Sequence, residues 1–183
     1  MELLDIVDEN GNPTGETVDR KIAHRDGIRH RTSHVWLFRK TMNGDVEVLL
    51  QQRSLTKDSN PGCFDVSSAG HIPAGCDYAE SALRECSEEL GITVDEQQLH
   101  YCFHKRVYYE KEFYGELFKD NQVSAVFYLW VREDQQDFQI QKEELEDVIW
   151  LPYEKAVEGI RNHAFPNCID LEEIEGLRAY LTE

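Results

Sequence analysis

Short apolar runs separated by turn-forming residues recur along most of the chain. They predict strands at residues 3–7, 16–18, 33–38, 47–52, 65–68, 99–109, 123–131 and 148–151. The run at 123–131 is apolar at nearly every position, which favours a strand buried on both faces of a sheet. Asn10-Gly11 predicts a tight hairpin between the first two strands, and residues 110–119 fit either a loop or a hairpin.

The clearest helical pattern lies at residues 78–90. Asp77 is a candidate N-cap, and Gly91 stands where a helix-ending glycine is expected. The apolar residues of this segment fall on one stripe: Ala79, Ala82, Leu83, Cys86 and Leu90. Shorter helices are predicted near residues 19–24, 153–162 and 171–182. Strands with helices packed on them predict an α/β fold, with a mixed sheet in an α/β/α sandwich and an N-terminal β-hairpin extension at residues 1–30.

Three carboxylates converge on another face of the helix at 78–90. Glu85, Glu88 and Glu89 are spaced i, i+3 and i+4, so their side chains share one turn. Such a group of oxygen ligands suits a hard divalent cation, Mg²⁺ or Mn²⁺. Arg84 is spaced to bridge Glu80 and Glu88. The alternative interpretation is an acidic, solvated face of a surface helix.

Together with the preceding loop, this segment (residues 69–92) resembles the signature of the Nudix hydrolase family, G-x5-E-x7-R-E-U-x-E-E-x-G-U, where U is bulky and apolar. The matching positions are Gly70, Arg84, Glu85, Cys86, Glu88, Glu89, Gly91 and Ile92. Cys76 stands where the family has a glutamate that helps organise the loop and the start of the helix. The resemblance implies a single Nudix domain over residues 1–183.

In activity, the resemblance implies a metal-dependent hydrolase that cleaves a diphosphate bond in a nucleoside-diphosphate-linked or related small substrate. Glu85, Glu88 and Glu89 are then the expected metal ligands, with the Gly70 carbonyl as an additional one. The catalytic base that deprotonates the attacking water is expected among these acids or at Glu144. A different hypothesis is that the chain is a nucleotide-binding module on the same scaffold that no longer cleaves its ligand.

Cations near these acids are candidates for binding substrate phosphates. Arg53 and Lys57 belong to the polar segment that follows the predicted strand at 47–52, and Arg84 precedes Glu85. The alternative interpretation is that Arg53 and Lys57 are exposed basic residues with no ligand. Aromatic residues that could contact the rest of the substrate are Tyr108, Tyr109, Phe113 and Tyr114, for which packing in the core or on the surface is the commoner fate.

The opening of the chain also resembles the Nudix branch that contains type I isopentenyl-diphosphate isomerase. The alignment places Ala69 at the isomerase's catalytic cysteine, and Asp120 and Gln122 at two of its glutamates. Because a methyl group cannot transfer a proton, isomerase activity is disfavoured. His24, His30 and His71 align with metal ligands of that branch, but we interpret them here as ordinary polar residues in loops.

Net charge and cysteine content limit the partners and the cellular compartment that we expect for this protein. With 36 acidic and 19 basic residues the net charge is −17, which disfavours nucleic acid and anionic membranes as partners. The five cysteines are scattered without zinc-type spacing, and there is no signal peptide or long apolar run, so we expect a cytoplasmic protein with reduced thiols. The sequence leaves the oligomeric state open, with a homodimer through the N-terminal hairpin or the sheet as one expectation.

Overall fold

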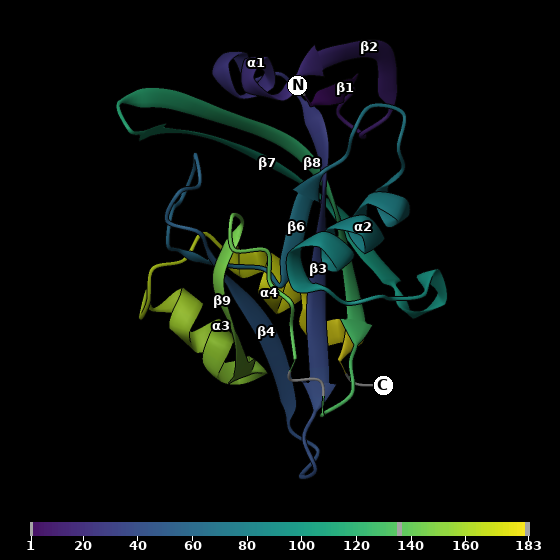
Figure 1. Ribbon diagram of the computed structural model, residues 1–183, viewed down its shortest axis with the longest axis vertical. Coiled ribbons are helices and arrows are strands. Elements are labelled where there is room, and N and C mark those ends of the chain that lie inside the picture. The colour runs from purple at the N-terminus through teal and green to yellow at the C-terminus, as the bar shows by residue number, and fades with distance from the viewer. Residues whose placement is uncertain (1, 135–136, 182–183) are drawn as a thin grey trace.

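The computed structural model describes residues 2–134 and 137–181. A mixed sheet forms its centre (Figure 1). Its strands are β3 (His30–Lys40), β4 (Val46–Arg53), β5 (Phe64–Asp65), β6 (Ser68–His71), β7 (His100–Phe113), β8 (Glu116–Trp130) and β9 (Leu145–Pro152). The order is β5-β4-β3-β8-β7, with β6 paired to β3 and β9 paired to β4. Among the strands of the described residues, only β3 and β8 pair in parallel, and the other pairs are antiparallel. The sheet is therefore mixed, as predicted.

The strand β3 has two partners, β6 and β4, on the same edge. We call the point at which β6 and β4 diverge from β3 the fork, and it positions the functional site. Its first half pairs with β6 and its last residues pair with β4. The sequence predicts one strand at 65–68, but the structure divides it between β5 and β6. Ser67 lies in the fork, where its hydroxyl accepts the Leu37 N–H at 2.8 Å and donates to the Leu49 carbonyl at 2.6 Å. A side chain therefore bridges the two strands where backbone pairing stops.

Helices cover both faces of the sheet, as the sandwich prediction requires. On one face, α2 (Tyr78–Leu90) packs its apolar stripe against Val35 and Leu37 of β3. On the other face, α3 (Tyr153–Arg161) and α4 (Leu171–Gly176) pack against Trp36 and Phe38. Alternation along β3 thus sends successive apolar residues into two separate cores.

The ends of α2 are those the sequence predicts. The Asp77 carboxylate accepts the Glu80 backbone N–H, and Gly91 has a left-handed backbone. The helix expected at 171–182 is shorter: α4 ends at Gly176, a 3₁₀ turn follows at Leu177–Tyr180, and Thr182 lies outside the described residues. None of the described helices has the length and apolar character needed to cross a bilayer.

Two extensions flank the site. The first is a hairpin of β1 (Leu3–Val7) and β2 (Pro13–Asp19), followed by α1 (Arg20–Asp26), which is capped by Asp19 and ended by Gly27. The second is the long antiparallel ribbon of β7 and β8, which projects beyond the rest of the sheet (Figure 1). Residues 110–119, for which the sequence allowed a loop or a hairpin, therefore form a hairpin.

Candidate functional site

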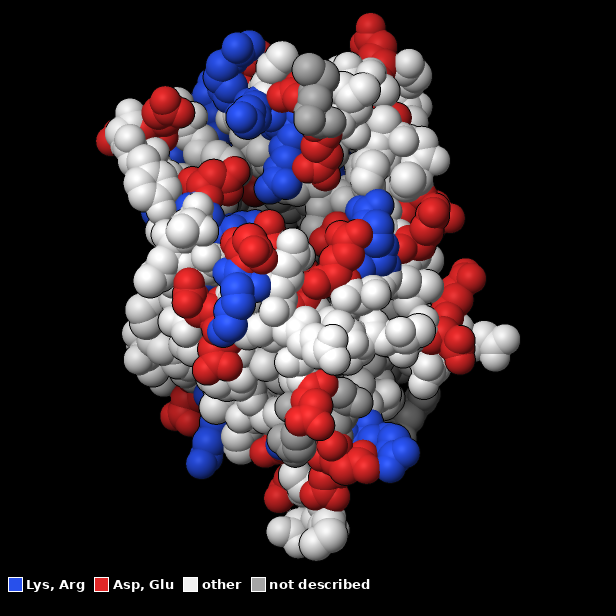
Figure 2. Space-filling view, in the orientation of Figure 1, with Lys and Arg blue, Asp and Glu red and all other residues white. Residues whose placement is uncertain are grey.

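A cavity of about 680 Å³ opens beside the fork in the sheet. Its lining includes residues of α1, α2 and α4, of the strands β3, β6, β7 and β8, of the chain from the end of β4 to β5, and of the segments that precede β9 and α4. Figure 2 shows acidic and basic side chains close together around a hollow in this face of the molecule. Although the chain is strongly acidic, the cavity combines carboxylates with lysine, arginine and histidine.

The three predicted metal-binding acids line one wall of this cavity. Glu89 is only 5% exposed, and its Oε2 accepts the Ser68 hydroxyl at 2.7 Å and the Ala69 N–H at 3.2 Å. Burial raises the pKa of Glu89 to about 8, and burial also raises the pKa of Glu85. Glu88 lies at the exposed end of the group. Raised pKa values at two of three neighbouring acids indicate that the site lacks a compensating positive charge. A divalent cation would supply this charge and therefore fits this set of oxygen donors.

Gly70 packs directly against Glu85. A Cβ added to Gly70 would lie 2.2 Å from the Glu85 carboxyl carbon, so only glycine lets the acid occupy this place. Arg84 orients the group from the side, with its Nη2 3.1 Å from Glu85 Oε1 and its Nε 3.9 Å from Glu88 Oε1, instead of bridging to Glu80. The described lining of the cavity does not include Arg84. Its substrate-binding role therefore stays a prediction, while its contacts are those of a residue that holds the acids.

The other two predicted cations have different surroundings. Lys57 and Glu144 form an ion pair at the cavity wall, so the structure brings together the predicted phosphate-binding lysine and the predicted base. Arg53 also reaches the cavity, but it makes four hydrogen bonds to Ser59 and Asp65. These bonds hold the β4–β5 segment and leave little of the guanidinium free for a phosphate.

The floor of the cavity is built by strand register. His30, Thr32 and His34 alternate along β3 and point to the same face. Their partners on the neighbouring strands continue the same face: Ala69 and His71 on β6, Gln122 and Ser124 on β8, and beyond β8, Lys105, Val107 and Tyr109 on β7. Thr32 donates to Gln122 Oε1 at 3.1 Å and lies 2.7 Å from the Ser124 hydroxyl. Polar side chains thus continue across four strands.

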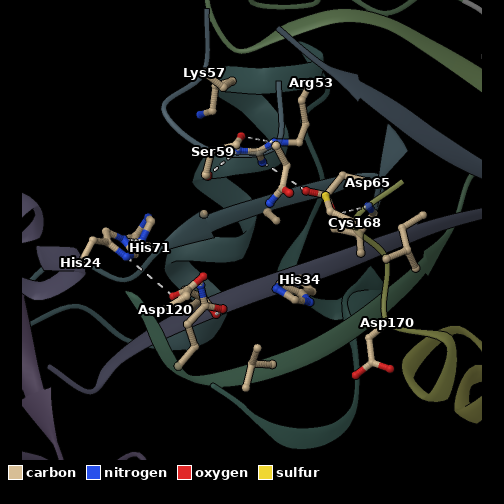
Figure 3. A pocket seen from close by; sticks show the side chains of 18 of the residues that line it. His24, His34, Arg53, Lys57, Ser59, Asp65, His71, Asp120, Cys168 and Asp170 are labelled. Carbon is tan, nitrogen blue, oxygen red and sulfur yellow. Dashed lines mark hydrogen bonds and ion pairs between the residues drawn. The ribbon is translucent and has the colours of Figure 1, made fainter. Parts of the chain in front are cut away.

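One end of this floor holds the three histidines. Their nitrogens lie within 4.8 Å of one another, and His24 Nε2 is 3.0 Å from His71 Nε2. Asp120 Oδ1 is 3.8 Å from both His24 Nδ1 and His30 Nε2. Figure 3 shows His24, His71 and Asp120 grouped in this way, with His34 further along β3. The expectation of ordinary loop histidines is wrong, because they lie in α1, β3 and β6 and converge.

This histidine cluster has the donor chemistry of a metal site. His30 Nε2 and Asp120 Oδ1 are buried without a hydrogen-bond partner among the described residues. Burial lowers the pKa of His24, His30 and His71, which favours the neutral ring, and a neutral imidazole has one nitrogen lone pair that can bind a metal ion. Imidazole nitrogens with a carboxylate suit a transition-metal ion such as Mn²⁺ or Zn²⁺.

The aromatic candidates have separate roles. Tyr109 lines the cavity together with Phe118, whose ring stacks on His24 at 4.2 Å between centroids. Tyr108 is exposed, and Phe113 packs edge-on against Phe118. Tyr114, at the tip of the β7–β8 ribbon, donates to the Lys57 carbonyl at 3.1 Å and so contacts the segment that carries the lysine.

Sequence reasoning missed the cluster of His34, Lys105 and Glu173. Glu173 lies in α4, within the helix predicted near residues 171–182, and this acid is 3% exposed and bonds to His34 on the sheet. The available signal was His34 itself. It shares its face of the strand with the core residues Trp36 and Phe38, which is an unusual place for a polar side chain without a partner.

The family model described as the NUDIX domain matches residues 28–168. A curated relative, Nudix hydrolase 3 of Arabidopsis thaliana, is 38% identical over 157 residues, which cover 84% of this chain but 20% of the plant protein.

Among solved structures, a Deinococcus radiodurans protein aligns with a TM-score of 0.71 at 20% identity, covering 97% of this chain and 98% of that one. The NUDIX domain of Shewanella oneidensis NrtR, in complex with ADP-ribose, aligns with a TM-score of 0.60 at 22% identity, covering 90% of this chain and 94% of that one. At these identities the likeness shows a shared fold.

Proposed function

Because the chain belongs to the Nudix family, we propose that it is a metal-dependent hydrolase that cleaves a diphosphate bond in a small substrate. The observation that carries this proposal is the convergence of Glu85, Glu88 and Glu89 on one wall of a cavity, beside Gly70. Two of these acids have raised pKa values, which a bound cation would reverse.

In the proposed reaction, the three acids and the Gly70 carbonyl would hold the cation, Mg²⁺ or Mn²⁺. When bound, such a cation neutralises phosphate oxygens and the charge that develops on the bridging oxygen. Glu144 accepts a proton from the attacking water, and its ion pair with Lys57 keeps the carboxylate at the cavity wall. Lys57 binds a phosphate oxygen of the substrate once the diphosphate enters.

We propose a nucleoside-diphosphate-linked or related diphosphate as the substrate class. A cavity of about 680 Å³ has room for a ligand of that size. Tyr109 and Phe118 offer aromatic rings at its edge, against which a base can pack. The ADP-ribose in the related Shewanella domain is a ligand of this class. We place the enzyme in the cytoplasm, since its five cysteines are all free thiols.

The isomerase alternative is not favoured by the site. Ala69 brings only a methyl group to the floor beside His34. Gln122 donates to Asp120 at 2.7 Å and accepts from Thr32, so the amide takes part in a hydrogen-bond network and carries no charge. A module that binds a nucleotide without cleaving it is the remaining alternative, and the experiment below separates it from a hydrolase.

The test is a hydrolysis screen of purified protein with Mg²⁺ or Mn²⁺ against nucleoside diphosphates linked to sugars, nucleosides and phosphates, with isopentenyl diphosphate included. We expect product nucleotides by chromatography, and loss of turnover by about 100-fold or more in Glu88→Gln. Glu80→Gln is the matched control, because Glu80 is an exposed acid on the same helix. Nucleotide binding by calorimetry without turnover in the wild type would instead support the binding module.

A further inference from the structure

His34 lies on the cavity floor one residue away from the acidic wall. In the sheet register His34 is paired with Ala69 of β6, and the backbone N–H of Ala69 is bound by Glu89. Ala69 therefore links the two: its methyl side chain shares the face of the sheet that carries His34, and its backbone N–H contacts the acid. A ligand held at the acids can extend across this methyl group to reach the histidine.

The buried acid Glu173 holds the His34 ring in one orientation. Its two oxygens lie 2.9 and 3.1 Å from His34 Nδ1, and it also accepts the Trp36 indole N–H at 2.8 Å and the Lys105 ammonium at 2.9 Å. Because a carboxylate can only accept, Nδ1 carries a proton. The ring therefore directs its other nitrogen, Nε2, away from Glu173.

Nε2 is the nitrogen left to interact with a ligand. His34 lines the cavity with a side chain that is 17% exposed, and the hydrogen bonds that it makes within residues 2–134 and 137–181 all run through Nδ1. Lys105 differs, because its ammonium is already paired with Asp170 and Glu173. Of these two cationic side chains at this end of the cavity, His34 is the one with a nitrogen available to a substrate.

The charge of His34 also suits an anionic ligand. Burial disfavours the charged ring, but the charge of Glu173 and the hydrogen bond to it outweigh burial and raise the pKa of His34. Burial likewise disfavours the Glu173 carboxylate, yet His34 and Lys105 lower the pKa of this acid to about 2. The carboxylate thus favours a protonated ring, in which Nε2 carries a hydrogen.

We infer that His34 is a substrate-binding residue whose Nε2–H donates to an anionic oxygen of the phosphate that lies on the far side of the scissile bond from the acidic wall. This inference rests on the proposed function, since it places the diphosphate between Glu89 and His34. The ligand class is a diphosphate or longer phosphate chain. We expect a single phosphate held at the acids not to reach His34, because Ala69 lies between the two in the sheet register.

The test compares His34→Ala and His34→Gln with the wild type. We expect about a tenfold rise in KM for the best diphosphate substrate in His34→Ala, the range for loss of a charge-assisted hydrogen bond. Glutamine, which keeps a neutral donor, should restore part of the loss. His104→Ala is the control, because His104 is an exposed histidine on β7 that bonds to Tyr101 outside the cavity lining.

A binding assay separates this inference from the proposed function. A nucleoside diphosphate analogue with a methylene bridge is titrated calorimetrically with Mn²⁺ present, alongside Mn²⁺ alone and the nucleoside monophosphate. We expect His34→Ala to weaken only the analogue. The wild type could show no hydrolysis while His34→Ala still weakens only the analogue. That result would contradict the proposed hydrolase activity and would support the role of His34 in binding. Equal analogue affinity in folded wild type, His34→Ala and His34→Gln overturns the inference even if the wild type is an active hydrolase.

Discussion

Arg31 and Asp5 form a buried ion pair that ties the N-terminal hairpin to the loop in front of α2. Arg31 Nη2 lies 2.8 Å from Asp5 Oδ2 and donates to the Cys76 carbonyl at 2.8 Å. The same Asp5 oxygen accepts the Gly75 N–H at 2.9 Å. Cys76 occupies the position at which the family signature has a loop-organising glutamate. In this chain, an acid from β1, outside the residues matched by the family model, contacts that loop.

The first prediction concerns this pair. Asp5→Ala leaves the Arg31 guanidinium buried and unpaired, so we expect the free energy of unfolding to fall by about 3–5 kcal/mol. We also expect weaker Mn²⁺ binding, because the loop that leads from Gly70 into α2 loses an anchor. Urea denaturation and calorimetry measure the two effects. Glu16→Ala, an exposed acid on β2, should change neither. Equal stability of both variants would contradict the anchoring role.

The second prediction concerns Glu89 and pH. Burial raises the pKa of this carboxyl to about 8, so below pH 8 the metal-free acid carries a proton that a cation must displace. Metal affinity should therefore rise as the pH increases from 6 to 8, with proton release on binding. Calorimetry with Mn²⁺ in two buffers of different ionisation enthalpy counts the protons. Glu89→Gln should bind more weakly and lose most of this release, whereas an unchanged count would refute the assignment.

The third prediction concerns the base. If Glu144 takes the proton from water, Glu144→Gln lowers kcat by about 10²–10⁴-fold, with little change in Mn²⁺ affinity. Glu143→Gln, an exposed neighbour, is the matched control. Lys57→Met should raise KM, because it removes a cation at the cavity wall, and should also lower kcat, though less than Glu144→Gln does, because Glu144 loses its ion-pair partner. Equal kcat in the two glutamine variants would transfer the base role to one of the acids on α2.

The fourth prediction concerns stability and pH. The pKa of Glu173 is lowered from 4.5 to about 2, so its contribution is complete above pH 4.5 and is lost as the pH falls toward 2. The pKa of His34 is raised from 6.5, so its contribution is complete below pH 6.5 and is lost as the pH rises through the raised value. The pair is therefore most stabilising between pH 4.5 and 6.5.

Denaturation of wild type and Glu173→Gln from about pH 2 to about pH 8, which spans both sides of this window, measures that contribution. We expect the difference in unfolding free energy between the two proteins to shrink on the acid side by at most about 3 kcal/mol. Glu172→Gln, an exposed neighbour on α4, should track the wild type at every pH. A constant difference between wild type and Glu173→Gln would mean that Glu173 acts only through its shape.

The sequence by itself determined the features that depend on neighbours along the chain. The cap at Asp77, the glycine at Gly91 and the apolar stripe between them define α2, and the same helical spacing places three acids on one turn. Alternation and turn residues predicted most strands to within a few residues. These features are readable because helix and strand periods are short-range properties of the backbone.

The tertiary structure alone decided which distant side chains meet. His34 and Glu173 are 139 residues apart in sequence, and Asp5 reaches Arg31 across 26 residues. The division of one predicted strand at Ser67 also arises from the neighbours β3 and β4 rather than from the local sequence. Strand order and register bring such groups together, and neither is encoded in the spacing of any one segment. The three histidines that looked like separate loop residues therefore became one cluster only when β3, β6 and α1 were placed side by side.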